Sequence, residues 1–209
     1  MKRRAQFITL EGGDGSGKST QLIRLVAALT KHGVAAIATR EPGGSPGAED
    51  IRKLVLNGDP KRWDALTEAL LMFAARSDHV ARTIKPALAE NTWVVCDRFT
   101  DSTYAYQGAG HGLARETIRR LEALVLDGFR PELTLILDIP VEVGLARTTG
   151  RSMDMRFEGF DLAFHERMRQ SYLAIARRDP ERCIVIDAAT DEDTLSAAIW
   201  QAVAKRFKL

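Results

Sequence analysis

A phosphate-binding loop is indicated by eight residues near the start of the chain, Gly12-Gly13-Asp14-Gly15-Ser16-Gly17-Lys18-Ser19. They match the pattern G-x-x-x-x-G-K-[ST] at every specified position, between an apolar run and a helical pattern. Such glycines let backbone N–H groups turn inward around an oligophosphate. Lys18 can reach the outer phosphates, and the Ser19 hydroxyl can ligate Mg²⁺. The loop, with Thr20 after it, therefore predicts a binding site for a nucleoside triphosphate.

Polar residues also follow two later apolar runs. One run leads into Thr39-Arg40-Glu41-Pro42-Gly43-Gly44, where Arg40 can grip a phosphate oxygen and the proline and glycines stiffen and turn the loop. The other ends in Asp97-Arg98-Phe99, where Asp97 can orient magnesium-bound water and Arg98 can hold a phosphate. Taken alone, the first is explained by a surface turn and the second by a capped helix start. With the phosphate-binding loop, they predict a site for two substrates.

Alternating strands and helices must position these residues. Short apolar runs predict five buried strands, at residues 5–11, 34–39, 92–97, 133–139 and 183–187. Helical patterns predict helices at residues 17–32, 47–57, 64–90, 99–108, 114–128, 141–149, 157–179 and 190–206. This alternation predicts an α/β fold with a parallel sheet and right-handed crossovers, in which ligands bind at the carboxyl ends of the strands.

The composition is that of an ordinary globular protein. The 209 residues, 45% hydrophobic and 28% charged, suit one domain spanning residues 1–209. The net charge of +2 argues against non-specific nucleic-acid binding. Cys96 and Cys183 lie in apolar runs, which favours buried thiols in a reducing compartment. No apolar run approaches the length of a membrane span. We therefore expect a soluble, cytoplasmic protein without membrane or nucleic-acid partners.

The three loop segments together resemble the thymidylate kinases. The resemblance spans nearly the whole chain, including Phe129-Arg130-Pro131-Glu132-Leu133-Thr134 and an arginine-containing segment at about residues 147–158. It implies a three-layer P-loop kinase fold, with a five-stranded parallel sheet flanked by helices and a short mobile lid at that segment. It also implies transfer of the γ-phosphoryl of ATP to dTMP, giving dTDP and ADP in dTTP biosynthesis. Mg²⁺ would be the cofactor and a homodimer the assembly.

The resemblance also assigns residues to the acceptor nucleotide. Arg40 and Arg98 would hold the dTMP phosphate, and Asp14 would lie near the sugar 3′-hydroxyl and the metal. Tyr106 would pack under the deoxyribose, where a ring rejects a 2′-hydroxyl by steric clash and desolvation. The positions near the pyrimidine would be Ser102, Thr103 and Gln107.

One residue at the base departs from the family pattern. Thymidylate kinases commonly place an aromatic residue four positions before an arginine that bonds thymine O4. Here Arg76 is preceded by Met72 at four positions and by Phe73 at three, and both lie on the same face of a helix. Met72 is the matched position, but we favour Phe73 because a planar ring stacks better on a base.

The arginine that assists phosphoryl transfer is expected in the lid. Some thymidylate kinases carry it in the phosphate-binding loop, but Gly15 follows Asp14 here, as in the lid-arginine type. Arg151 is expected to contact the phosphates, with Arg156 as the alternative, and Arg147 is expected to border ATP. The predicted catalytic set is Asp14, Lys18, Arg98 and Arg151, and Ser19 and Asp97 are the predicted metal ligands.

Two other functions compete with this interpretation. A different nucleotide or deoxynucleoside kinase would share the phosphate machinery but take another acceptor. A non-catalytic nucleotide switch or structural ATPase subunit would bind nucleotide without acceptor-dependent turnover, which leaves Arg40 and Arg98 without a role. An Asn-Lys-x-Asp guanine-recognition loop, as in GTPases, does not occur in the sequence.

Overall fold

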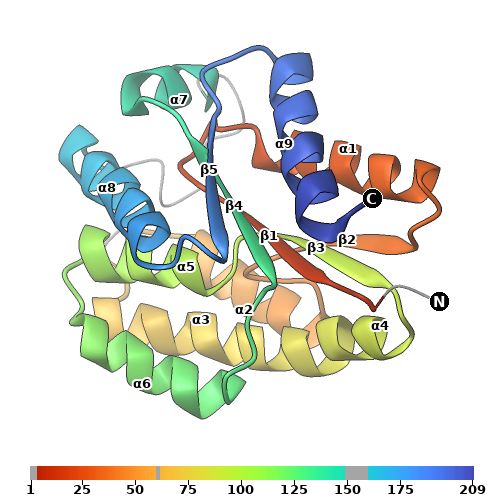
Figure 1. Ribbon diagram of the computed structural model, residues 1–209. Coiled ribbons are helices and arrows are strands. Elements are labelled where there is room, and N and C mark those ends of the chain that lie inside the picture. The colour runs from red at the N-terminus through yellow and green to blue at the C-terminus, as the bar shows by residue number, and fades with distance from the viewer. Residues whose placement is uncertain (1–3, 60–61, 149–159) are drawn as a thin grey trace.

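A parallel β-sheet forms the centre of the molecule (Figure 1). The computed structural model describes residues 4–59, 62–148 and 160–209. Within these residues the strands are β1 (Phe7–Glu11), β2 (Ala36–Arg40), β3 (Trp93–Asp97), β4 (Leu133–Asp138) and β5 (Cys183–Asp187). They are arranged in the order β2-β3-β1-β4-β5, and every pairing is parallel. The predicted five-stranded parallel sheet is confirmed.

The three inner strands explain the continuous apolar runs. Nearly every residue of β1, β3 and β4 is buried, because helices cover both faces of a parallel sheet. The edge strands β2 and β5 are more exposed. The strand register aligns Asp97 with both Leu10 and Arg40, so the loops after β1, β2 and β3 leave the sheet at the same edge.

Helices form a layer on each side of the sheet. On one side, α1 (Lys18–Lys31) packs against α9 (Glu192–Phe207). On the other side, α8 (Leu162–Arg178) packs on β4 and β5, and α4 (Lys85–Ala89) packs on β3. The other α-helices of the described residues are α2 (Pro46–Leu56), α3 (Ala65–His79), α5 (Thr100–Thr103), α6 (Arg115–Leu126) and α7 (Val141–Thr148). This arrangement confirms the α/β fold and brings the amino ends of α1 and α5 to the edge that carries the loops.

Two predicted helices contain π-helical turns. The predicted helix at 64–90 is continuous, but η1 (Val80–Ile84) separates α3 from α4. Pro86 follows this turn, and because its ring crowds the carbonyl four residues earlier and it lacks an N–H, a wider turn relieves the conflict. The predicted helix at 99–108 likewise consists of α5 followed by η2 (Tyr104–Gly110).

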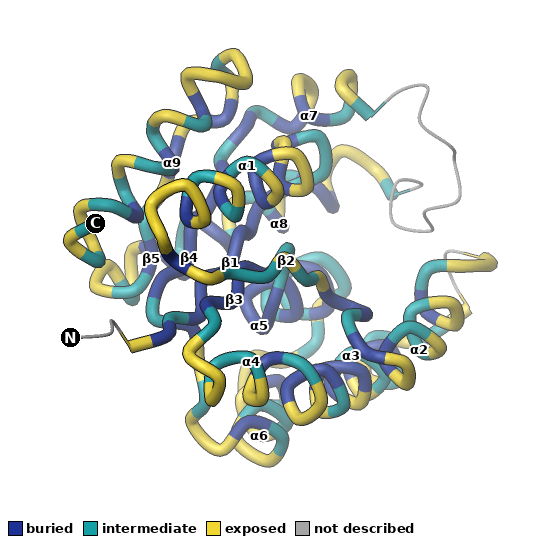
Figure 2. The backbone as a smooth tube through the Cα atoms, turned by 90° about the vertical axis from the view of Figure 1, so that its right-hand side faces the viewer, coloured by how far each residue is buried: buried dark blue, intermediate teal, exposed yellow. Residues whose placement is uncertain are grey.

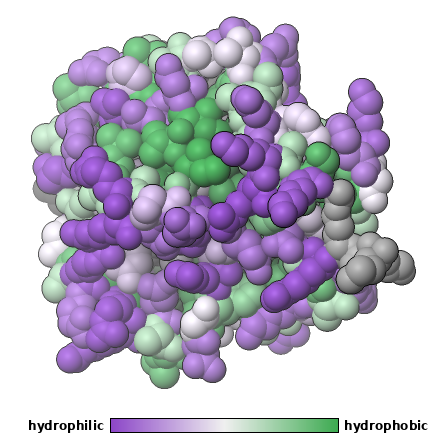
Figure 3. All heavy atoms as spheres, in the orientation of Figure 1, coloured by the Kyte–Doolittle hydropathy of each residue, from purple (hydrophilic) through white to green (hydrophobic). Residues whose placement is uncertain are grey.

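Burial is concentrated in the sheet and on the inner sides of the helices, while the outer sides are exposed (Figure 2). Figure 3 shows apolar side chains gathered around β5, the edge strand in which Val185 is 44% exposed. Cys96 and Cys183 are buried free thiols. None of the helices in the described ranges has both the length and the apolar character that crossing a membrane requires.

Candidate active site

A cavity of about 810 Å³ opens at the carboxyl edge of the sheet. It is bounded by the loops after β1, β2, β3 and β5, together with parts of α2, α3, α5 and η2. The predicted site residues that line it are Asp14, Gly15, Ser16, Gly17, Lys18, Ser19, Thr20, Arg40, Met72, Arg76, Asp97, Arg98, Ser102, Thr103, Tyr106, Gln107 and Arg147. Gly12 and Gly13 instead line a small cavity of about 20 Å³ beneath the loop. The structure thus brings residues from distant parts of the sequence to one place.

The phosphate-binding loop connects β1 to α1 and holds Lys18 at its centre. Gly17 precedes the helix with φ +87, a left-handed conformation that glycine adopts readily. The Lys18 ammonium donates to the Gly13 carbonyl at 2.7 Å and to Ser16 Oγ at 3.2 Å. Burial, reinforced by the nearby positive charge of Arg98, lowers the pKa of Lys18 to about 8. An anion bound in the loop would therefore contact the Lys18 ammonium, which is poorly solvated by water.

Gly15 has no room for a side chain. Its φ is +73, and a Cβ there would lie 1.9 Å from the carbonyl oxygen of Gly144 in α7. A Cβ on Gly144 would in turn lie 2.5 Å from the Asp14 carbonyl oxygen. The two glycines let the loop and α7 approach each other, so an arginine at position 15 would not fit this packing.

Ser19 and Asp97 form a polar pair at the start of α1 and the end of β3. Ser19 Oγ donates to Asp97 Oδ2 at 2.8 Å. The other carboxylate oxygen, Asp97 Oδ1, is buried and has no hydrogen-bond partner among the described residues. The described chain holds no cluster of three or more acidic, His or Cys residues suited to a metal. One carboxylate and one hydroxyl beside a phosphate site fit Mg²⁺, which usually keeps waters and phosphate oxygens as its other ligands.

Arg98 links the phosphate-binding loop to the acceptor side. Its backbone has φ +71, the left-handed region that non-glycine residues seldom adopt and that marks functional turns. The guanidinium donates to the Gly12 carbonyl at 2.9 Å and to Asp14 Oδ1 at 2.7 Å. Burial would raise the pKa of Asp14, but Arg98 and Lys18 hold it below its usual value. Asp14 is therefore an ionised carboxylate inside the cavity.

Beneath Arg98 lies a buried network that the sequence did not reveal. Glu11, the last residue of β1, accepts from the Phe99 amide at 2.7 Å and from Ser102 Oγ at 2.6 Å. Ser102 and Tyr172 of α8 share a hydrogen bond, and both lie within reach of the Arg98 guanidinium. Burial and the nearby Asp101 raise the pKa of Glu11 to about 7. A carboxylate ending a fully buried strand was the available signal.

Arg52 is a second residue that the sequence did not reveal. It lines the cavity from α2 beside Arg40, and donates to the Pro42 carbonyl at 2.7 Å. Burial and the charge of Arg40 lower its pKa. Arg52 lies four residues after Ala48 and three before Val55, both fully buried, so it is on the inner face of α2. An arginine on the apolar face of a predicted helix was the sequence signal that could have identified it. Arg40 itself pairs with Glu49 at 3.1 Å.

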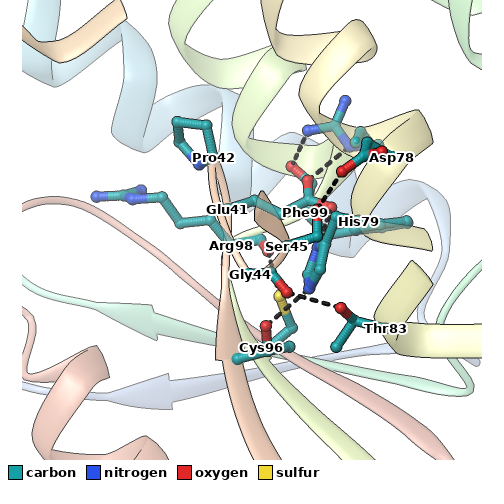
Figure 4. Close-up of polar contacts among 12 residues, drawn as sticks. Glu41, Pro42, Gly44, Ser45, Asp78, His79, Thr83, Cys96, Arg98 and Phe99 are labelled. Carbon is teal, nitrogen blue, oxygen red and sulfur yellow. Dashed lines mark hydrogen bonds and ion pairs between the residues drawn. The ribbon is translucent and has the colours of Figure 1, made fainter. Parts of the chain in front are cut away.

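Arg76 is fixed by a buried set of partners between α3 and the loop after β2. Its Nε donates to Glu41 Oε2 at 2.7 Å, and the other Glu41 oxygen contacts His79 Nδ1 at 3.0 Å. Figure 4 shows His79 beside Glu41, with Thr83 bonded to the Gly44 carbonyl. The Nη1 atom of Arg76 is buried and has no hydrogen-bond partner in the described part of the chain. Arg76 also lines the cavity, so one nitrogen of a cavity-lining guanidinium is not used by the described protein groups.

The structure favours Met72, not Phe73, at the cavity wall. Met72 lines the cavity, whereas Phe73 does not and is only 1% exposed. The Phe73 ring instead packs under the Arg76 guanidinium, 4.8 Å from ring centre to Cζ. The sequence-based preference for Phe73 as the residue that stacks on the base is therefore corrected in favour of Met72. The 100° step between successive helix residues turns Phe73 into the core while Met72 stays in line with Arg76.

The segment from α5 through η2 supplies four residues to the cavity, Ser102, Thr103, Tyr106 and Gln107. They recur at a four-residue spacing, so the π-helical turn keeps them on one face. Thr103 Oγ1 accepts from Arg76 Nη2 at 3.2 Å. The Tyr106 hydroxyl reaches Asp14 Oδ2 at 3.2 Å, and its ring lies 4.9 Å from the Arg98 guanidinium. The Tyr106 hydroxyl and the Asp14 carboxylate thus lie beside each other in the cavity.

Arg147 borders the other end of the cavity. It donates to the Ala188 carbonyl at 2.9 Å and to the Thr190 carbonyl at 3.3 Å, in the loop after β5. Thr190 and Asp191 of that loop also line the cavity, and the sequence had not singled them out. Arg151 and Arg156 lie outside the described residues.

Comparisons with known proteins point to one family. Residues 10–199 match the family model described as thymidylate kinase. A thymidylate kinase from Caulobacter vibrioides is 56% identical over 203 residues, covering 97% of this chain and 98% of the relative. One from Pseudomonas putida (strain GB-1) is 54% identical over 183 residues, covering 88% and 87%. The crystal structure of a thymidylate kinase from Ehrlichia chaffeensis superposes with a TM-score of 0.77 at 34% identity, covering 95% and 98%.

Proposed function

Because this chain belongs to the thymidylate kinase family and is a dTMP kinase, we propose that its cavity holds ATP and dTMP together, with their phosphates meeting at Arg98. The observation that carries this assignment is the contact of Arg98 with both Gly12 and Asp14. It joins the phosphate-binding loop to an arginine at the end of β3 in one cavity. A phosphoryl donor and a phosphate acceptor can therefore be held in line.

The donor half is formed by the phosphate-binding loop and the loop after β5. The backbone amides of residues 13–19 and Lys18 hold the ATP phosphates, as in other loops of this kind. Arg147 borders the nucleoside end, where it is held by the carbonyls of Ala188 and Thr190.

The acceptor half surrounds the dTMP phosphate with cations. Arg98 and Arg40 hold this phosphate, and Arg52 adds a third positive charge on the same side of the cavity. The attacking phosphate oxygen is already nucleophilic, so these residues aim it without any strong general base. Asp14 faces the sugar 3′-hydroxyl, and Tyr106 packs under the deoxyribose.

The pyrimidine lies between α3 and η2. Met72 contacts the face of the base, and Arg76 Nη1 donates to thymine O4. Thr103 and Gln107 face the base edge, while Ser102 supports Arg98 from below. The Tyr106 ring leaves no space for a 2′-hydroxyl, and this gives the preference for deoxyribose over ribose.

Ser19 and Asp97 would hold the Mg²⁺ that accompanies ATP. Their hydrogen bond and the unpartnered Asp97 Oδ1 support this assignment. The ion neutralises charge on the phosphate oxygens when it is bound.

A lid arginine completes the site in this proposal. Arg151 contacts the transferred phosphoryl, with Arg156 as the alternative. Support comes from the contact of Gly15 with Gly144, which leaves no space for an arginine at position 15 of the phosphate-binding loop. A single domain at 1–209, a cytoplasmic location and a homodimer belong to the same proposal. The dimer is supported by exposed leucines on α3 and α6, namely Leu66, Leu70 and Leu124.

A panel of nucleoside monophosphates tests the acceptor. ADP release would be measured with ATP and each of dTMP, dUMP, dCMP, dGMP and AMP. We expect dTMP to give the highest kcat/KM. A higher kcat/KM with another acceptor would favour a different nucleotide kinase, and ATP binding without acceptor-dependent ADP release would favour a non-catalytic switch.

A further inference from the structure

Glu68 is a buried carboxylate behind the base-binding wall. It lies in the first turn of α3, is 1% exposed, and does not line the cavity itself. It shares one face of α3 with Met72 and Arg76, because the three residues are spaced four apart. From this position it contacts Gln107 of η2, whose Nε2 donates to Glu68 Oε1 at 2.6 Å.

This contact fixes which end of the Gln107 amide faces Glu68. A carboxylate only accepts hydrogen bonds, so the atom against it must be the amide nitrogen. The carbonyl oxygen Oε1 is then the atom that Gln107 can offer to a ligand in the cavity that it lines. Without Glu68, rotation by 180° about the last side-chain bond would exchange the donor and the acceptor.

Arg76 presents the complementary group beside it. Its Nη2 is bonded to Thr103, one helical turn before Gln107, and its Nη1 has no partner among the described residues. The wall therefore offers a donor from Arg76 and an acceptor from Gln107. A 4-oxopyrimidine has the matching edge, since its O4 accepts and its N3–H donates. Cytosine reverses both groups, because its 4-amino group donates and its N3 accepts.

We propose that Glu68 is a positioning residue that makes the acceptor site select 4-oxopyrimidines over cytosine, by holding Gln107 with its carbonyl oxygen toward the base. The inference rests on the proposed function, because it assumes that the base occupies the wall between α3 and η2. Cytosine would be rejected strongly, because its amino donor would face the Arg76 donor and its N3 acceptor would face the Gln107 oxygen, which leaves buried polar groups without hydrogen bonds.

The test compares the wild-type protein with Glu68→Gln, a substitution of nearly equal size. A glutamine at position 68 can pair with either end of the Gln107 amide, so the preference for dTMP over dCMP should fall at least about tenfold. We expect this change mainly in the KM values, which steady-state ADP release would measure. The preference for dTMP over dUMP should not change, because uracil has the same O4 and N3–H.

Two controls separate positioning from general damage. Glu122→Gln replaces another carboxylate that binds this segment, through Tyr104, away from the cavity, and should leave the selectivity unchanged. In a Gln107→Ala background, Glu68→Gln should have no further effect on selectivity. If dTMP is the wild-type acceptor but the ratio of kcat/KM for dTMP to kcat/KM for dCMP is unchanged in Glu68→Gln, the inference about Glu68 is wrong while the proposed function stands. Wild-type protein without dTMP turnover would overturn the proposed function instead.

Discussion

At the scale of single residues, the cavity is dominated by charges that burial keeps from water. At the phosphate-binding loop, Lys18 donates to the Gly13 carbonyl and Arg98 donates to the Asp14 carboxylate. Phosphoryl transfer is catalysed mainly by positioned charges, and such charges act more strongly where water is excluded. The pKa values of these buried groups are therefore the most direct experimental reports on the site.

Nucleotide binding should take up a proton at Lys18. Burial lowers the pKa of Lys18 to about 8 in the unliganded site, while bound phosphates favour its charged form. Affinity for ADP should therefore fall as the pH rises from 7 to 9. Calorimetry at pH 8.5 in two buffers of different ionisation enthalpy should show net proton uptake. Lys18→Arg, which stays protonated, should lose that uptake, and its absence in the wild type would contradict the prediction.

Glu11 should make the fold less stable as the pH rises through neutrality. Burial raises the pKa of Glu11 to about 7, so the folded state binds more protons than the unfolded state between about pH 5 and 7. The free energy of unfolding therefore decreases across that interval. Urea unfolding at several pH values should show a smaller decrease in Glu11→Gln than in Glu142→Gln, an exposed control on α7. Equal slopes in the two variants would count against this account.

At the scale of elements, α3 divides its residues between the cavity and the core. Glu68, Met72 and Arg76 face η2, whereas Phe73 points into the protein and supports the Arg76 guanidinium. Thr103 at the end of α5, and Tyr106 and Gln107 in the wider turn of η2, lie opposite that face. Substrate selection therefore depends on how two helices are rotated against each other.

Adjacent residues of α3 should accordingly give different phenotypes. Met72→Ala should raise the KM for dTMP severalfold with a modest loss of stability, because Met72 lines the cavity. Phe73→Ala should lower the free energy of unfolding by about 3–5 kcal/mol, because it empties a core position. Steady-state kinetics and urea unfolding would measure the two effects. A larger change in the KM for dTMP in Phe73→Leu than in Met72→Ala would indicate that Phe73, and not Met72, contacts the base.

At the scale of the whole molecule, α3 and α6 form an outer layer with exposed leucines. Leu66 and Leu70 are 45% and 49% exposed on α3, and Leu124 is 81% exposed on α6. The two helices pack against each other, so these side chains belong to one side of the molecule. Association of two copies there would cover the leucines while leaving the cavity edge of the sheet open.

Charge introduced at this surface should therefore separate the proposed dimer into single chains. Leu124→Glu should shift the mass measured by light scattering after gel filtration from that of a dimer toward that of one chain of 23.1 kDa. Ile23→Glu is the matched control, because Ile23 is 67% exposed on α1, on the other side of the sheet. Dissociation caused by Ile23→Glu but not by Leu124→Glu would place the interface elsewhere.

The sequence by itself determined the sheet, most of the helices and the phosphate-binding loop. Buried parallel strands require continuous apolar runs, and a loop around phosphate is encoded by neighbouring residues, so both are legible along the chain. Only the tertiary structure decided between Met72 and Phe73, placed Arg52 beside Arg40, and revealed Glu11 and Glu68 behind the site. These contacts depend on helix rotation and on which elements pack together, which residue spacing within one segment does not specify.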